Sequence, residues 1–191
     1  VAQAAVTLID PSPDEIDTVL PATPLWHEDI VIFTDVRQVF QCDDCPPQTP
    51  VSTNGLARAL VNLYGSQSGG QILEYNLSSF TFKQLAGFLD NIENGSIESL
   101  ADNLRAADWV IFNTLDFDTG YPESNALQRI LAERPDLLAN KKVIVFALDS
   151  PTYLDATNIS KITAYYALYS KETAFLDVAA RVLMKELTPA G

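Results

Sequence analysis

The chain has 191 residues, of which 47% are hydrophobic, and this is enough to form one globular domain with a sizeable core. Asp and Glu outnumber Lys and Arg by 25 to 12, and the resulting formal net charge of -13 disfavours binding to nucleic acid or to anionic membranes. Apolar runs reach only about six residues, whereas a membrane-spanning helix needs roughly 20. We therefore expect neither nucleic acid nor membrane as a partner. The chain begins with Val1, which we interpret as a sign of a fragment or processed form, so its compartment stays open.

Several segments have the pattern of strands that are buried on both faces, because their apolar residues are nearly continuous rather than alternating. A weaker strand is expected at 71–75, and an additional first strand at 4–9. The stronger candidates are residues 30–33, 109–112, 143–148 and 162–168. Strands of this kind are typical of parallel sheets.

Segments with helical spacing lie between these strands. Thr81 and Gln84 are placed to form a capping box at the start of one helix, and Gly65 is placed to end another. Pro122 suits the first turn of a third. The expected helices are 56–63, 82–89, 97–104, 127–131 and 175–183, and the proline-rich stretches 11–24 and 43–53 are expected to be loops. The alternation predicts a single domain, residues 1–191, with a doubly wound, mainly parallel α/β sheet covered by helices on both faces.

Ligands of open parallel sheets bind outside the carboxyl ends of the strands, and acidic residues gather there in this sequence. Such a rim suits a hydroxyl-rich ligand or a divalent cation. The alternative is that Asp and Asn simply cap turns and helices after the strands. The candidate ligand-binding residues are Asp35, Arg37, Asp116, Asp149 and Tyr153.

Other common site patterns are absent or incomplete. Neither a P-loop nor a dinucleotide-binding glycine motif occurs, so no cofactor is expected. Cys42 and Cys45 have the spacing of a redox or metal pair, but the chain contains no further cysteine and a single histidine, His27. This set is too small for a zinc site, and we expect no metal; the two cysteines form either a local disulfide or a pair of free thiols.

The order of segments resembles the C-terminal α/β sandwich domain of glycoside hydrolase family 3, especially its β-N-acetylhexosaminidase-like and β-glucosidase-like members. The matching stretches include a first strand with its turn, an apolar strand after an Ala-Asp pair, a strand that leads into a small-residue-Pro turn, and a closing strand and helix. These stretches are residues 5–10 with 20–21, 106–112, 128–131, 142–151, 163–170 and 174–183.

The resemblance implies a catalytic barrel in the same polypeptide that carries the nucleophile, with carbohydrate as the ligand. In glucosidase-like members the acid/base glutamate lies in a loop that often reads Glu-Gly-x-Asp-Arg, whereas residues 116–124 read Asp-Phe-Asp-Thr-Gly-Tyr-Pro-Glu-Ser here. Glu123 is the only glutamate of this loop, and its place after Pro122 also fits an acidic residue in a first helical turn. This difference from the glucosidase-like loop sequence favours the N-acetylhexosaminidase-like branch, in which this domain is accessory.

Three functional hypotheses follow. The first is an accessory domain of a family 3 glycoside hydrolase for β-linked amino sugars or glucosides, not catalytic alone. The second is a free-standing flavodoxin-like domain that binds a sugar or another small ligand. The third is a hydrolase that uses strand-end acids and a metal ion.

Overall fold

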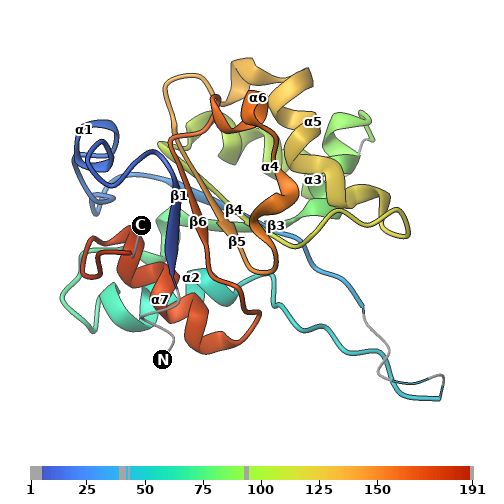
Figure 1. The fold of residues 1–191 in the computed structure, drawn as a ribbon, viewed down its shortest axis with the longest axis horizontal. Coiled ribbons are helices and arrows are strands. Elements are labelled where there is room, and N and C mark those ends of the chain that lie inside the picture. The colour runs from blue at the N-terminus through green and yellow to red at the C-terminus, as the bar shows by residue number, and fades with distance from the viewer. Residues whose placement is uncertain (1–5, 39–41, 43, 93–94, 190–191) are drawn as a thin grey trace.

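The structure, a computed structural model, describes residues 6–38, 42, 44–92 and 95–189. Its strands are β1 (Thr7–Asp10), β2 (Ile30–Thr34), β3 (Leu77–Thr81), β4 (Trp109–Thr114), β5 (Lys142–Ala147) and β6 (Ala164–Ala167). Within the described residues they form one sheet in the order β1-β6-β5-β4-β2-β3 (Figure 1). β1 is antiparallel to β6, and all other neighbouring strands are parallel. The expectation of a mainly parallel sheet is therefore confirmed.

Helices connect the parallel strands. The α-helices of the described residues are α1 (Ile16–Val19), α2 (Gly55–Tyr64), α3 (Phe82–Leu89), α4 (Gly95–Ala106), α5 (Ala126–Glu133), α6 (Ala156–Ile159) and α7 (Thr173–Leu183). Short 3₁₀ helices occur at η2 (Glu74–Asn76), η3 (Pro122–Asn125), η4 (Pro135–Leu137) and η5 (Pro151–Tyr153). None of these described helices has both the length and the apolar character that a membrane span requires.

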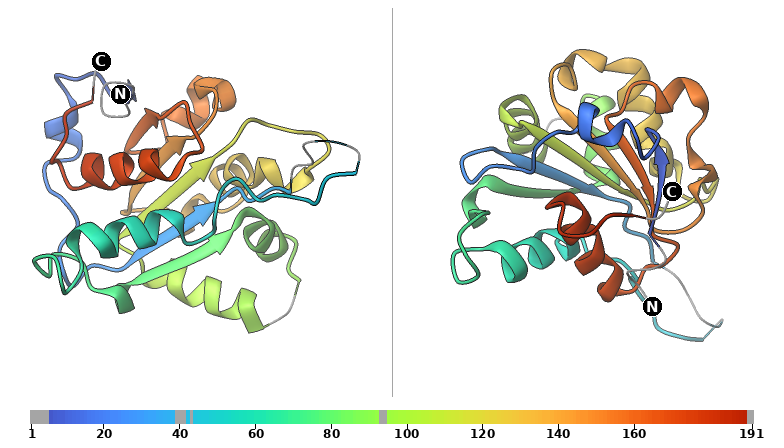
Figure 2. Two further views of the ribbon diagram at one scale, coloured as in Figure 1. Left: turned by 90° about the horizontal axis from the view of Figure 1, so that it is seen from below. Right: turned by 60° about the vertical axis from the view of Figure 1, so that its left-hand side comes forward.

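Two hydrophobic clusters lie on opposite faces of the sheet. In β2, Ile30 and Ile32 belong to the cluster with α2 and α7, whereas Val31 and Phe33 belong to the cluster with α3, α4 and α5. Figure 2 (right) shows these two groups of helices on either side of the strands. Because successive side chains of a strand point to opposite faces, both faces need apolar residues. This explains the continuous apolar runs of the central strands.

The edge strand β3 was not predicted. The weak strand expected at 71–75 is wrong: these residues precede β3, and Glu74–Asn76 forms a 3₁₀ turn. Among the described strands β3 pairs with β2 only, and its Ser78 and Ser79 are partly exposed. An edge strand has one open side and tolerates polar residues, so the apolar pattern that identified the central strands does not extend to it.

Smaller differences concern loops and helix starts. The expected loop 11–24 contains the single turn of α1, and Pro122 begins a 3₁₀ helix rather than the α-helix that follows it. By contrast, the capping box is confirmed: Gln84 N donates to Thr81 Oγ1 at 3.1 Å, and Thr81 N donates to Gln84 Oε1 at 2.8 Å. Residues 4, 5 and 43 of the expected first strand and second loop lie outside the described residues.

The strand order reverses between β2 and β4. After β2 the chain continues to β3 on one side, and it then returns to β4 on the other side of β2. The five parallel strands thus follow the order 2-1-3-4-5 of flavodoxin-like sheets, in which ligands bind where the order reverses. The carboxyl ends of β2 and β4 flank this reversal point.

At the opposite end of the sheet, Glu28 connects the starts of three strands. Glu28 Oε2 accepts hydrogen bonds from Leu25 N at 2.9 Å and from Trp109 Nε1 at 2.8 Å, and Glu28 Oε1 accepts one from Lys142 Nζ at 3.2 Å. Burial alone would raise the pKa of Glu28, but these three hydrogen bonds outweigh it and hold the pKa below its ordinary value of 4.5. The ionised carboxylate is therefore part of the folded structure.

We expect Glu28→Gln to lower the free energy of unfolding at pH 7 by about 1–3 kcal/mol, because an amide cannot accept all three hydrogen bonds. A group with a lowered pKa in the folded state stabilises the protein above its unfolded pKa and loses this contribution as the pH falls through the folded value. The difference between the variant and the original chain should therefore shrink below pH 4.5. Urea denaturation at pH 7 and pH 3 measures it, with Glu133→Gln, on the surface of α5, as the matched control. An equal difference at both pH values would contradict this role.

Candidate functional site

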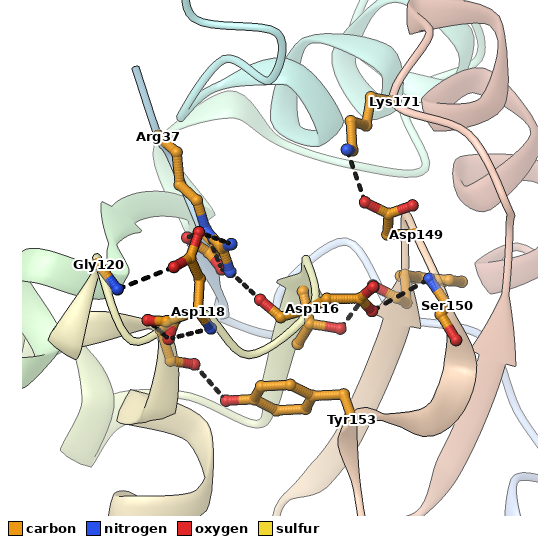
Figure 3. Close-up of polar contacts among 12 residues, drawn as sticks. Arg37, Asp116, Asp118, Gly120, Asp149, Ser150, Tyr153 and Lys171 are labelled. Atoms are coloured by element: carbon orange, nitrogen blue, oxygen red, sulfur yellow. Dashed lines mark hydrogen bonds and ion pairs between the residues drawn. The ribbon is translucent and has the colours of Figure 1, made fainter. Parts of the chain in front are cut away.

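The loops after β2, β4 and β5 meet at the carboxyl end of the sheet, and Arg37 lies among them (Figure 3). Arg37 Nη2 donates to Asp35 Oδ2 at 2.6 Å, and Arg37 Nε donates to Asp35 Oδ1 at 3.1 Å. The two side chains are only 9% and 1% exposed. Because an unpaired charge in such a buried position is strongly unfavourable, the two residues form one structural unit.

Arg37 also fixes the loop that follows β4. Its guanidinium donates to the main-chain carbonyl of Asp116, lies 3.5 Å from Asp118 Oδ2, and lies 5.7 Å from the centre of the Tyr121 ring. The Tyr121 hydroxyl donates in turn to the main-chain carbonyl of Gln38. The segments after β2 and β4 are thus joined at several points (Figure 3).

The charge of Arg37 is stable. Burial alone would lower the pKa of its guanidinium, but hydrogen bonds and charge from Asp35, together with the charge of Asp118, raise that pKa above its ordinary value. Arg37 therefore stays positively charged and cannot transfer protons. Its position indicates that it organises the loops rather than taking part in acid/base chemistry.

Ser124 closes the same loop. Asp118 N donates to Ser124 Oγ at 3.1 Å, Gly120 N donates to Asp118 Oδ1 at 2.8 Å, and the Tyr153 hydroxyl donates to the main-chain carbonyl of Ser124. Burial raises the pKa of Tyr153, and the negative charge of Asp35 adds to this effect. The phenol therefore stays protonated at neutral pH and serves as a hydrogen-bond donor within the structure.

Asp116 and Asp149 lie closer to the rim. Asp116 Oδ1 accepts a hydrogen bond from Ser150 N at 3.2 Å, and Asp149 Oδ2 pairs with Lys171 Nζ at 2.6 Å (Figure 3). The side chains of Asp149 and Lys171 are 45% and 39% exposed. At such a half-exposed pair the carboxylate of Asp149 can accept hydrogen bonds from a polar ligand and the ammonium group of Lys171 can donate them, without large desolvation.

Glu123 lies in a different place from the Arg37 contacts. It lines a groove of about 560 Å³ that also includes residues of α3 and α5. Asp90, the other carboxylate among the described residues that line this groove, is paired with Arg129 at 2.8 Å. Glycoside cleavage by the usual mechanism needs two carboxylates on either side of the bond, and the described lining of the groove offers Glu123 no second carboxylate that is free of an ion pair.

Cys42 and Cys45 are joined by a disulfide, with their Cα atoms 5.0 Å apart. The bond joins Cys42 to an arm, defined here as residues 44–50, that extends from the carboxyl end of the sheet (Figure 1). All residues of the arm except Cys45 are exposed. In the part of the chain that the structure describes, no group of three or more His, Cys, Asp or Glu side chains could hold a metal ion.

The structure thus brings Asp35, Arg37 and Asp116 into one set of contacts, to which Tyr153 is connected through Ser124. Asp149 lies beside this set at the rim (Figure 3), Glu123 lines a groove whose described lining includes none of these residues, and the cysteines are bonded to each other. The sequence analysis missed Ser124, Tyr121 and Lys171, which contribute through contacts made across loops. No residue spacing marks such contacts, and only the nearness of Ser124 and Tyr121 to Asp118 in the sequence could have pointed to them.

Comparisons with known proteins give a structural likeness only. No family model matches the chain, and no curated protein matches its sequence. Solved structures of glycosidases have a similar fold, at identities of 18% or less in the three examples that follow, and the first two of these are described as members of glycoside hydrolase family 3. They are a fungal multi-domain β-N-acetylglucosaminidase with a GCN5-related glucosamine N-acetyltransferase region (TM-score 0.59, 18% identity), a β-N-acetylglucosaminidase from Paenibacillus sp. str. FPU-7 (0.55, 13%) and β-glucosidase 3B from Thermotoga neapolitana (0.52, 13%).

These matches cover nearly all of this chain but only a small part of each enzyme. They cover 98%, 100% and 97% of this chain, but only 17%, 30% and 28% of the respective enzymes. The chain therefore has the fold of one segment of larger enzymes. Fold and rim together define a class: an α/β domain that resembles part of multi-domain glycoside hydrolases and whose carboxyl-end loops are fixed by a buried ion pair.

We expect Arg37→Met to lower the free energy of unfolding by about 3–5 kcal/mol, because Asp35 would stay buried without its partner. Urea denaturation followed by circular dichroism measures the effect. The double variant Asp35→Leu/Arg37→Met should recover most of the loss, since it removes both charges. Arg134→Met, which breaks an exposed ion pair with Asp136, is the matched control and should leave stability nearly unchanged. A similar loss in the single and the double variant would contradict the coupling.

Proposed function

We propose that this chain is an accessory domain of a larger glycoside hydrolase of family 3, in which residues 1–191 form one doubly wound α/β sandwich. The observation that carries the proposal is the likeness along 97% or more of this chain to less than a third of the length of such enzymes. The whole polypeptide would act on β-linked amino sugars or glucosides through a catalytic barrel, and the present domain would pack against that barrel. It would not cleave glycosides by itself.

The carboxyl end of the sheet is the surface that fits this role. Phe117 and Tyr169 follow β4 and β6, and they are 54% and 52% exposed although both carry large apolar rings. The arm extends from the same end of the sheet (Figure 1). Exposed rings on loops that are already held in place can dock with little loss of conformational freedom. This surface would therefore face the barrel.

The acids at this end divide into two groups. Asp35 is buried and supports the loops together with Arg37 and Tyr153, so we assign these three residues a positioning role. Asp116 and Asp149 lie nearer to solvent, and we assign to them the hydrogen bonds to sugar hydroxyl groups where the domain borders the active site. Glu123 would carry no catalytic step, since its groove lies apart from these residues.

The alternative is a free-standing flavodoxin-like domain that binds a small ligand. The strand order favours it, because a ligand of such a sheet binds where the order reverses, between β2 and β4. Here the side chains that follow β2 fill this position with the buried Asp35–Arg37 pair. A ligand would have to displace a satisfied ion pair, so the accessory role is the better supported of the two.

The isolated chain should release no nitrophenol from 4-nitrophenyl N-acetyl-β-glucosaminide or from 4-nitrophenyl β-glucoside. Absorbance at high protein concentration measures this, with Glu123→Gln as the control. Turnover by the chain that disappears in Glu123→Gln would overturn the accessory role and make Glu123 catalytic. Sequencing the gene on both sides of the segment that encodes residues 1–191 is the complementary test. An open reading frame that encodes no barrel would also overturn the proposal.

In the full polypeptide, Phe117→Asp should lower glycosidase activity several-fold and reduce the temperature of unfolding, because a charge would be buried in the contact with the barrel. The same substitution should leave the stability of the isolated chain nearly unchanged, since Phe117 is exposed there. Val19→Asp, at an exposed position of α1, is the matched control. If both variants of the full polypeptide behave alike, the carboxyl-end surface is not the contact with the barrel.

A further inference from the structure

A rigid turn precedes β2 at the amino end of the sheet. Glu28 N donates to the main-chain carbonyl of Leu25 at 3.0 Å, and Leu25 N donates back to the Glu28 carboxylate at 2.9 Å. Trp26 and His27 are the two central residues of this turn. Because Glu28 is also bonded to Trp109 and Lys142, the turn is anchored to the starts of β4 and β5.

The anchored turn exposes a large aromatic side chain. Trp26 is 59% exposed, and its ring meets His27 edge-on, with the ring centres 5.2 Å apart. Neither side chain is drawn into the hydrophobic core, although Pro24, two residues earlier, is buried. Leaving an indole ring in water is unfavourable by the free energy that its burial would supply. A single exposed ring is common on protein surfaces, so a binding role requires a second exposed ring on a neighbouring segment.

A second exposed ring lies on the neighbouring segment. Tyr75, in the turn before β3, is 78% exposed, and the next residue, Asn76, donates from Nδ2 to the main-chain carbonyl of Trp26 at 2.9 Å. The register of β2 and β3 pairs Ile30 with Leu77, which places these two turns side by side. Figure 2 (left) shows both segments at the end of the sheet opposite to the arm. The two neighbouring turns thus each carry an exposed aromatic ring.

We propose that Trp26 and Tyr75 form a platform that stacks on pyranose rings of a β-linked glucan or chitin-type polysaccharide; the sugar class rests on the proposed function. The apolar faces of β-linked pyranoses match aromatic rings, while their equatorial hydroxyl groups can bond to His27 and to the Tyr75 phenol. A neutral polysaccharide is also compatible with the net charge of -13, which would repel an anionic polymer.

A protein partner fits this surface less well. Stable protein interfaces bury about 1,200–2,000 Å² in total, whereas the apolar residues exposed on these turns are Leu25, Trp26 and Tyr75 only. A sugar chain, by contrast, needs just one ring for each pyranose that it stacks. The hydrogen bonds of Glu28 hold the turn in place beforehand, so binding would order few groups. The platform would keep the polysaccharide near the enzyme, at the end of the domain that faces away from the carboxyl-end loops.

Intrinsic fluorescence offers a direct readout. The chain contains two tryptophans, and Trp109 is 1% exposed, so quenching by acrylamide reports mainly on Trp26. We expect chitohexaose or cellohexaose to cause a saturable change in emission and to protect Trp26 from acrylamide. The chain should also sediment with insoluble chitin or cellulose.

Trp26→Ala should weaken binding about tenfold or more, and Tyr75→Ala should weaken it several-fold, because each removes a stacking ring. Trp26→Phe should retain part of the affinity. Sedimentation with the insoluble polysaccharide measures all variants, including those that lack the Trp26 signal. Ile92→Ala is the matched control, since it shortens a large apolar side chain that is 52% exposed and lies outside both turns. Urea denaturation should show equal stability for all four variants, because the side chains are exposed.

Absence of saturable binding to both oligosaccharides, or equal binding by Trp26→Ala and the original chain, would overturn the platform. Loss of activity on a soluble chromogenic substrate in a full polypeptide with Trp26→Ala, without loss of polysaccharide binding, would overturn it too and indicate a partner domain instead. Failure of the platform leaves the accessory role intact if the gene encodes a barrel. Conversely, sugar binding through Trp26 in a protein without a barrel would sustain the platform and remove the accessory role.

Discussion

Apolar side chains cover the central strands on both faces, and this burial is the constraint on which the rest of the molecule depends. All residues of β2, β4 and β5 except Lys142 are buried, so their main-chain groups must be paired within the sheet. Parallel pairing requires that the chain return to the same end of the sheet before every strand. All residues able to meet a ligand are therefore restricted to the two ends of the sheet and to the outer surfaces of the helices.

Each end of the sheet is organised by one charged side chain. Arg37 binds the main chain and the acids of the loops after β2 and β4, and Glu28 binds groups at the starts of β2, β4 and β5. Both hold several loops through one set of directional contacts, which are stronger than neutral hydrogen bonds. At the carboxyl end this arrangement leaves half-exposed acids at a rim, whereas at the amino end it presents Trp26.

Predictions from the sequence agree with the structure where the local sequence pattern is strong. The central strands and the capping box of Thr81 could be predicted, because their patterns reflect burial on two faces and a reciprocal pair of hydrogen bonds. β3 could not, since an edge strand with Ser78 and Ser79 has neither a continuous nor an alternating apolar pattern. The position of Asp35 next to Arg37 was evident from the chain, but their burial was not. The contact between Arg37 and Asp116 joins residues 79 positions apart, and nothing in the local sequence marks it.

The sequence by itself determined the class of fold, the mainly parallel sheet and the end of that sheet at which the acids gather, because hydrophobic periodicity and strand-end position are local properties. Only the tertiary structure decided which of these acids are buried supports and which face solvent. It placed Glu123 in a separate groove and joined the turn that carries Tyr75 to the turn that carries Trp26. The physical reason is that burial and pairing depend on which loops become neighbours, and the order of strands in the sheet, rather than their order in the chain, decides this.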